Sequence, residues 1–301
     1  MVFLDMVHRK KHNGENRYQL MKLIVSSKED PASMNILNNL LGQDWDEVGD
    51  YLGNQVYRKR NFLSVTTNRH HIYENRIDQK VSNDFNLDID QVIFISKHAS
   101  EAGINSLTVH PIGNLGEAKY GGEDGKLVPT SPFDMTMALR ILKKFHSRDH
   151  AVSGYDVSFE ATHHGPYLET PTFYIEIGSD KEQWKDEKAG AVIAKIVMDL
   201  EGLSEKKYPV IVCIGGGHYA PRFTELALEK KVSIGHMVPG WGLKFLTPTS
   251  FIRLIENTPK AEYVYFDRSS TKGKERKRIK RWIKEKDMDL EVVRSKDIDD
   301  L

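Results

Sequence analysis

The sequence predicts a three-layer α/β/α fold with a parallel or mixed central sheet. Segments with the apolar pattern of strands alternate along the chain with segments that begin at helix caps, and this alternation is typical of an α/β unit. Two of the strand segments, VIFIS at 92–96 and VIVCI at 210–214, are continuous apolar runs. Such runs are typical of strands that are covered by helices on both faces of the sheet.

The predicted elements follow one another from residue 21 onward. The strands cover residues 21–27, 61–67, 92–96, 105–110, 172–177, 209–214 and 262–266. Helix starts are predicted at Asp30-Pro31, Ser131-Pro132, Thr247-Pro248 and Pro221, because proline fits the first helical turn. Ser179 and Glu182 form an S-x-x-E capping box, which predicts a helix from there to about Leu200.

The chain of 301 residues is long enough for one large or two small domains. We expect residues 1–20, which are mostly polar and basic, to form a mobile N-terminal extension. Residues 21–301 should form one compact α/β unit, with two lobes at 21–115 and 116–301 as the alternative. The oligomeric state is left open by the sequence, and a monomer is our expectation.

The composition fits a globular protein in water, with 39% apolar and 29% charged residues. No apolar run reaches the ~18–20 residues that a membrane-spanning helix needs. The single cysteine, Cys213, has no partner within the chain for a disulfide and lies in an apolar run, so we expect a buried, unreactive thiol. Sparse cysteine fits a cytoplasmic protein.

The net charge is zero, but one segment is strongly basic. Residues 272–286, KGKERKRIKRWIKEK, hold nine basic and two acidic residues. The pattern predicts a helix over 271–287 whose apolar face, Ile279, Trp282 and Ile283, docks on the protein body. Its basic face is either an ordinary solvated surface or a contact for a phosphate backbone.

Histidines recur where predicted strands end. His98, His110, His218 and His236 each end or follow an apolar run, and the pair His163-His164 follows VSFEAT. If these strands are parallel neighbours, their carboxyl ends meet at one edge of the sheet and the imidazoles converge there. Imidazoles together with carboxylates are the ligands that Zn²⁺ prefers.

Two further features bear on such a site. In the alternating segment FYIEI, Glu176 points away from the apolar face and toward the region of the histidines. His163 and His164 would face opposite sides of a continuous strand, so both serve one site only if the strand ends near Thr162. The Gly165-Pro166 pair favours a break at this place.

The alternative is that these histidines are ordinary polar groups with hydrogen-bond partners. The chain has neither H-E-x-x-H nor C-x-x-C, so no local metal motif supports the site. The other adjacent pair, His70-His71, is interpreted as a surface pair.

Two loops are candidates for ligand contact. The turn Gly215-Gly216-Gly217 allows a close backbone approach, so its N–H groups are candidates for holding a phosphate or an oxyanion; the alternative is a plain tight turn. Trp241, in the loop MVPGWGLKF, either stacks on a base or lines a pocket, or it packs into the core.

Five segments together resemble one family. MKLIVSSKEDPAS (21–33), ISKHAS (95–100), FEATHHGP (159–166), IEIGS (175–179) and GGGHYAPRFTE (215–225) look like the D-aminoacyl-tRNA deacylases of archaea and plants, in the same order. The joint presence of EATHHGP and GGGHYAP is highly specific. The resemblance runs from residue 21 to near the C-terminus.

The resemblance implies a zinc-dependent hydrolase with a phosphorylase/hydrolase-like α/β fold. It would cleave the ester between a D-amino acid and the 3′ end of tRNA, a step of translation proofreading. The matching motif positions are His98, Glu160, His163, His164 and His218. Our hypothesis is that the four histidines hold the metal and that Glu160, His164 and His218 act in catalysis. The motifs do not separate metal ligands from residues that move protons.

For substrate binding we expect contributions from Gly215, Gly216, Gly217, Lys244, Arg278 and Arg281. The expected partner is aminoacyl-tRNA, with no role for DNA or a membrane. Two other functions fit the same residues. One is a metallohydrolase that acts on small esters or peptides, and the other is a non-catalytic tRNA-binding protein with a structural metal.

Overall fold

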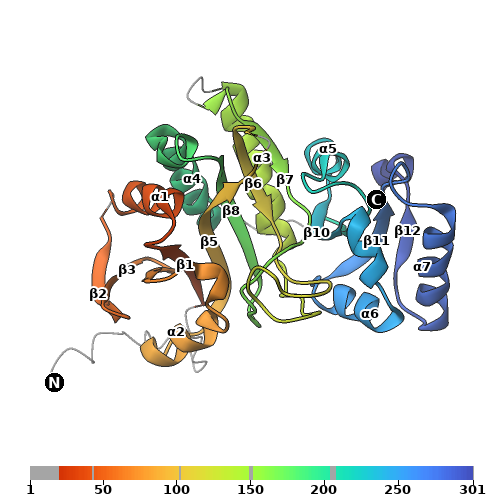
Figure 1. The fold of residues 1–301 in the computed structure, drawn as a ribbon, viewed down its shortest axis with the longest axis horizontal. Coiled ribbons are helices and arrows are strands. Elements are labelled where there is room, and N and C mark those ends of the chain that lie inside the picture. The colour runs from red at the N-terminus through yellow and green to blue at the C-terminus, as the bar shows by residue number, and fades with distance from the viewer. Residues whose placement is uncertain (1–19, 43, 102, 149–151, 204–207, 301) are drawn as a thin grey trace, which may run out of the picture.

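The computed structural model contains two sheets, one of eight and one of four strands (Figure 1). The structure describes residues 20–42, 44–101, 103–148, 152–203 and 208–300. The strand order is β2-β3-β4-β1-β5-β8-β6-β7 in the larger sheet and β10-β9-β11-β12 in the smaller one. The strands are β1 (Met21–Ser27), β2 (Asp46–Tyr51), β3 (Asn54–Lys59), β4 (Phe62–Thr67), β5 (Ile89–Ala99), β6 (Ser106–His110), β7 (Asp156–Phe159), β8 (Thr172–Ser179), β9 (Val210–Ile214), β10 (Ser233–Val238), β11 (Ala261–Phe266) and β12 (Glu291–Val293).

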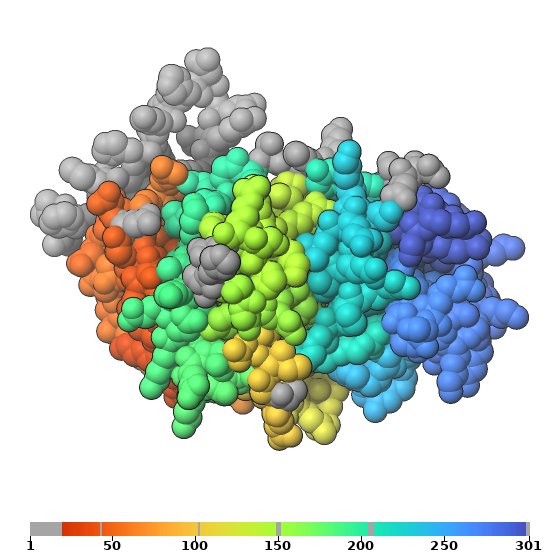
Figure 2. Space-filling view, turned by 90° about the horizontal axis from the view of Figure 1, so that it is seen from above, coloured from red at the N-terminus to blue at the C-terminus, as the bar shows by residue number. Residues whose placement is uncertain are grey.

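Helices cover both faces of the larger sheet, which confirms the predicted α/β class. The helices are α1 (Pro31–Leu41), α2 (Ile77–Phe85), α3 (Pro132–Arg148), α4 (Glu187–Asp199), α5 (Pro221–Glu229), α6 (Pro248–Glu256) and α7 (Gly273–Glu285). One hydrophobic core joins the larger sheet to α1, α3 and α4, and a second core lies on the side of α2 (Figure 1). A third core joins the smaller sheet to α6 and α7. In Figure 2 the red N-terminal part lies toward one end of the long axis and the blue C-terminal part lies at the other, with green, lime and cyan segments between them.

The sheet is mixed, and this decides where its side chains meet. β8 pairs in parallel with β5 but antiparallel with β6, and β6 pairs in parallel with β7. The carboxyl ends of β5 and β6 therefore lie toward opposite ends of β8. The expectation that the histidine-bearing strands are all parallel neighbours is wrong for β6 and β7.

The apolar strand predictions are confirmed within a few residues, and the missed strands are mostly polar or short. β2 and β3 form an antiparallel hairpin with mainly exposed or half-exposed residues, so they lack an apolar run that would identify them. β7, β10 and β12 have four, six and three residues. The larger sheet takes strands from both sides of residue 115, and the two-lobe boundary stays a prediction.

Most predicted helix starts are confirmed, and one is wrong. Thr247 forms a capping box with Ser250, and Pro221 and Pro248 occupy the first turns of α5 and α6. Ser179 does not cap a helix, because β8 continues through it in register with Ala99 of β5. The cap of α4 is Asp186, which accepts hydrogen bonds from the N–H groups at 188 and 189.

Two predictions about side chains are also confirmed. Cys213 is buried in β9, and burial raises the pKa of its thiol well above the ordinary value. The apolar face of α7, Ile279, Trp282 and Ile283, packs into the third core. The basic face of this helix is left on the outside.

Asp30, the cap of α1, is a fully buried carboxyl group. Its Oδ1 accepts a hydrogen bond from Ser33 N at 2.9 Å, and its Oδ2 accepts bonds from Lys97 N at 2.9 Å and from Ser96 Oγ at 3.1 Å. Burial raises the pKa of Asp30 to about 6, although these hydrogen bonds act in the opposite direction. The hydrogen bonds of Asp30 thus link the start of α1 to β5. Ionisation of this buried carboxyl group lowers the stability of the folded protein.

We expect Asp30 to make the stability of the protein fall as the pH rises. In the unfolded chain its pKa is near 3.8, so the stabilisation by the protonated group is complete below about pH 4 and is lost as the pH rises through 6. A difference of about two pKa units corresponds to roughly 3 kcal/mol. In Asp30→Asn this part of the pH dependence should vanish, as measured by urea unfolding between pH 4 and 7. Asp46→Asn, at an exposed position of β2, is the control; parallel profiles for wild type and Asp30→Asn would contradict the expectation.

Candidate active site

A cluster of histidines and glutamates lies on one face of the larger sheet, above the middle of β8. In the strand register His98 of β5 lies beside Gly178, whereas His110 of β6 lies beside Tyr174. Glu176 lies between these two levels. Its Oε2 is 3.7 Å from His98 Nδ1 and 3.6 Å from His110 Nε2. The two histidines therefore meet over the face of the sheet, rather than at one edge.

Glu160 is the buried centre of the cluster. It follows β7 directly, and its N–H still donates to Val109 O of β6. Its carboxylate lies 2.9 Å from His218 Nε2, 3.1 Å from His98 Nδ1 and 3.5 Å from His163 Nε2. Burial alone would raise the pKa of Glu160, but the close contact with His218 and the charges of the neighbouring histidines, His110 first, lower it overall. Glu160 is therefore an anion with no exposed surface.

The chain turns sharply after β7, so that His163 and His164 both reach the cluster. β7 ends at Phe159, before the predicted limit near Thr162, and His164 adopts a left-handed φ of 43°. The two imidazole rings lie 4.4 Å apart, and that of His163 is also 4.4 Å from His110. The predicted break in the strand is thus confirmed.

Hydrogen bonds to the backbone fix the protonation of these two rings. Nδ1 of His163 lies 2.8 Å from Ala161 O, and Nδ1 of His164 lies 2.6 Å from Gly165 O. Because a carbonyl only accepts, each Nδ1 carries the proton and each Nε2 presents a lone pair. Burial and the nearby histidines lower the pKa of both rings well below the ordinary value, so both are neutral.

This arrangement fits a bound cation. The lone pair on His163 Nε2 faces the carboxylate of Glu160 at 3.5 Å, so two hydrogen-bond acceptors lie opposite each other in a buried position. Within the described part of the chain, neither Glu160 oxygen makes a hydrogen bond of good geometry, and the same is true of His110 Nε2. Among the described residues there are three groups of side chains that could hold a metal ion, and within each group the donor atoms all lie within 4.8 Å of one another: His98, Glu160 and His218; His110, His163 and His164; and His110, Glu160 and Glu176. Nitrogen and carboxylate donors at such sites are typical of transition-metal centres.

The four histidines predicted as ligands are thus brought together, in two adjacent donor sets. His98 and His218 share a set with Glu160, and His163 and His164 share one with His110. Burial lowers the pKa of His110, but its contact with the Glu176 carboxylate outweighs burial and raises the pKa overall. The sequence marked His110 and Glu176 as neighbours of the site, but neither was placed among the site residues.

Tyr219 is a residue that the sequence analysis did not single out. Its hydroxyl lies 3.0 Å from His98 Nε2, and its ring lies 5.3 Å from the ring of His218. The feature of the sequence that could have identified Tyr219 is its position directly after His218. His218 and His163 are partly exposed, with 37% and 21% of their side chains accessible, whereas His98 and Glu160 are buried. Solvent therefore reaches the cluster from the His218 side.

The contacts of the glycine turn, Gly215-Gly216-Gly217, favour a role in packing over a role in anion binding. Gly215 and Gly216 have φ values of 111° and 79°. The N–H of Gly215 donates to Val238 O, and that of Gly216 donates to Ser270 Oγ. Ser270 Oγ in turn donates to the carboxylate of Asp267, which places a negative charge beside the turn. An oxyanion role for Gly215 and Gly216 is therefore disfavoured, and Gly217 remains as the candidate.

The other predicted substrate-binding residues lie beside this turn and not in the cluster. The 3₁₀ turn Gly240–Phe245 begins with a hydrogen bond from Gly240 N to Gly216 O. It carries Trp241, which is 53% exposed, so packing of this ring in the core is excluded. Lys244 Nζ lies 4.8 Å from the centre of the Phe245 ring.

Helix α7 is joined to the same 3₁₀ turn. Arg278 donates to Leu243 O at 3.1 Å. Arg281 lies further along the exposed face of α7, where its Nε is 3.6 Å from Glu285. The exposed aromatic side chain and the basic helix thus form one continuous surface near the glycine turn.

Two other histidine predictions are corrected. His71 is fully buried, with its ring against Phe94 and Tyr174, so the interpretation of His70-His71 as a surface pair is wrong. Burial lowers the pKa of His71 to about 3. His236 lies inside β10 and is bonded to Thr162 Oγ1 and Val128 O, so it has satisfied partners outside the cluster.

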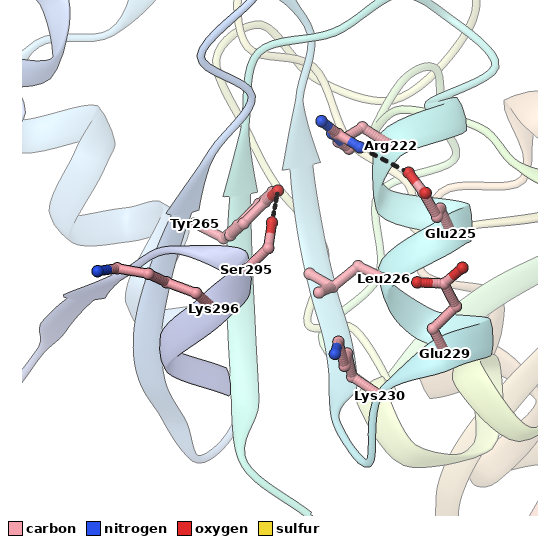
Figure 3. Close-up of a pocket in the computed structure, with 8 residues that line it drawn as sticks. All are labelled: Arg222, Glu225, Leu226, Glu229, Lys230, Tyr265, Ser295 and Lys296. Carbon is pink, nitrogen blue, oxygen red and sulfur yellow. Dashed lines mark hydrogen bonds and ion pairs between the residues drawn. The ribbon is translucent and has the colours of Figure 1, made fainter. Parts of the chain in front are cut away.

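A pocket on the far side of α5 has a different character. It has a volume of about 250 Å³ and lies between α5 and β11, where its rim carries the Arg222–Glu225 ion pair (Figure 3). None of the clustered histidines lines it. Within the described ranges, no helix is long and apolar enough to cross a membrane.

Comparisons with known proteins identify the family. The family model for D-aminoacyl-tRNA deacylase matches residues 85–291. A relative from Pyrococcus horikoshii with that name is 36% identical over 86% of this chain and 95% of its own length. One from Methanococcoides burtonii, also so named, is 39% identical over 92% of this chain but only 57% of its own, longer sequence.

A solved structure agrees with the sequence relatives in fold. It is described as a conserved protein of unknown function, is 31% identical to this chain, and superposes with a TM-score of 0.86 over 93% of this chain and 97% of its own. The residues that the matched family model spans include the whole cluster from His98 to His218. The chain belongs to the D-aminoacyl-tRNA deacylase family.

Proposed function

We propose that this protein hydrolyses the ester between a D-amino acid and the 3′ end of tRNA, and so acts in translation proofreading. Family membership supports the reaction. The observation that carries the proposal is the buried Glu160 carboxylate, which lies within 3.5 Å of His98, His163 and His218. Ester hydrolysis needs an activated water and groups that hold and move its proton, and this cluster contains such groups.

The cofactor that we propose is zinc, held by His98, His163 and His218 around the carboxylate of Glu160, with His164 left free to act on protons. When bound, zinc supplies a water that ionises near neutral pH and polarises the carbonyl of the ester. The carboxylate of Glu160 orients His98 and His218 through their ring nitrogens. His164 Nε2, which carries a lone pair, accepts the proton of the attacking water.

The tRNA body is proposed to contact α7. Arg278 donates to Leu243 O in the 3₁₀ turn that also carries Lys244, and Arg281 lies on the exposed face of the helix. Contacts to phosphates do not depend on base sequence, which suits an enzyme that acts on many tRNAs. We propose that Trp241, which is 53% exposed, stacks on an unpaired base of the 3′ end.

Parallel deacylation of D-Tyr-tRNA and L-Tyr-tRNA tests the proposal. We expect the enzyme to hydrolyse only the D-ester, to lose this activity on chelation, and to regain it when zinc is added back. D-specific activity that survives complete metal removal would leave the reaction standing but refute the zinc. Equal hydrolysis of both esters would favour a metallohydrolase for small esters, and tRNA binding without hydrolysis would favour a binding protein.

His164→Ala should lower kcat by about 100-fold or more, because the variant lacks the proton acceptor. The matched control is His146→Ala on α3, outside the cluster, which should keep full activity. Circular dichroism checks that both variants are folded. A folded His164→Ala protein with wild-type turnover would rule out this role.

Replacement of Lys274, Lys277 and Arg281 by Gln should raise KM for tRNA and flatten its dependence on salt. All three side chains are exposed on α7. Each lost phosphate contact should reduce the slope of log KM against log salt concentration by about one. Lys188→Gln with Lys195→Gln, at exposed positions of α4, is the control. An unchanged slope in the α7 variant would remove the helix from the tRNA contact.

A further inference from the structure

A second cavity lies directly beside the cluster, along the edge of the larger sheet. Its volume is about 490 Å³, within the ~300–1,000 Å³ that is usual for pockets that bind small ligands. It lies between β7, α5 and the segment before β6. We call it the edge pocket and define it by Ile104, Ser106, Val157, Ser158, Tyr219 and Leu228.

The edge pocket and the cluster share a wall. Tyr219 lines the pocket, and its hydroxyl is 3.0 Å from His98 Nε2. Ser106, another lining residue, approaches His98 above Gly178. A Cβ atom on Gly178 would lie 2.5 Å from Ser106 Oγ and 2.9 Å from His98 Cδ2, so both side chains need the glycine at this position. Tyr219 and Ser106 therefore lie between the pocket and His98.

An unpaired polar group lies in this wall. Ser106 is fully buried, and its Oγ has no hydrogen-bond partner within the described part of the chain. Thr108, two residues further along β6 and on the same side of the strand, also has a buried hydroxyl without a partner. The next residue on that side is His110 of the cluster. A buried hydroxyl without a partner costs stability unless a ligand or water satisfies it.

The rest of the pocket is largely apolar. Val157 and Leu228 provide aliphatic walls, Tyr219 provides an aromatic one, and Ile104 at the mouth is 42% exposed. Four charged residues also border the cavity, namely Lys143, Asp156, Glu225 and Glu229. By contrast, the pocket of Figure 3 is rimmed mainly by charged side chains and touches no residue of the cluster.

We propose that the edge pocket binds the side chain of the aminoacyl group and favours aromatic and long aliphatic D-amino acids. This inference rests on the proposed function. With the ester carbonyl at His98, Glu160 and His218, the α-carbon lies one bond away, and its side chain extends past Tyr219 into the apolar cavity.

The competing occupant is the terminal adenine of the tRNA. Adenine is common to all substrates, so blocking an adenine pocket would weaken every substrate equally. Blocking a side-chain pocket would weaken large aminoacyl groups and spare small ones. The two occupants therefore differ in the pattern across substrates.

The test is Leu228→Trp, which places a large ring in the pocket from α5, away from the histidines. We expect kcat/KM to fall by about tenfold or more for D-Tyr-tRNA and by no more than about twofold for D-Ala-tRNA. Leu290→Trp is the matched control, at another half-buried leucine that lines neither cavity. It should leave the ratio of the two substrates as in wild type.

Ile104→Trp fills the same pocket from its exposed mouth and covers the case in which Leu228→Trp does not fold. An equal loss for both substrates, or no loss in folded variants, overturns the inference and leaves the deacylase function intact. Wild-type enzyme that hydrolyses neither D-ester instead refutes the proposed function. The two failures are therefore distinct.

Discussion

The arrangement of the site depends on one buried negative charge, the carboxylate of Glu160. An ion without exposed surface is stable in a protein only when other groups replace its hydration. Here three histidines from different parts of the chain do so, at 2.9 to 3.5 Å. The sharp turn after β7, the position of His98 on β5 and the glycine turn before His218 all place ring nitrogens around the same two oxygens.

The same charge explains why the cluster favours a cation. Several histidines in contact would repel one another if each were protonated, and burial keeps His163 and His164 neutral. The lone pair of His163 then faces the Glu160 anion, and the donor atom of His164 lies within 4.8 Å of those of His163 and His110. A metal ion satisfies all these acceptors together, whereas a single proton satisfies only one pair.

The sequence predicted the parts of the molecule that are determined locally. Apolar runs identified the buried strands, cap residues next to proline marked α1 and α6, and Pro221 marked α5. The sequence did not predict the features that depend on pairing between strands far apart in the chain. Ser179 has the local pattern of a helix cap, but its pairing with β5 is stronger than that preference. The direction of β6 was not predictable either, and this direction places the site on the face of the sheet.

The site residues show the same limit. Strand-end histidines were recognisable, because the residue type and the preceding apolar run both lie in the sequence. His71 was misjudged, since its burial follows from contacts with Phe94 and Tyr174, which lie far along the chain. Tyr219 and Ser106 have no distinctive local pattern. Their importance depends on contact with His98, which only the folded chain reveals.

The mixed direction of the strands has a consequence for how the protein is made. The donor atoms come from β5, β6, the segment after β7, β8 and the segment after β9, so no short stretch of chain holds them together. The site can exist only after distant strands have paired, which is a slow kind of folding event. A metal would therefore bind the finished molecule in preference to its unfolded chain, and by mass action it would protect the native state.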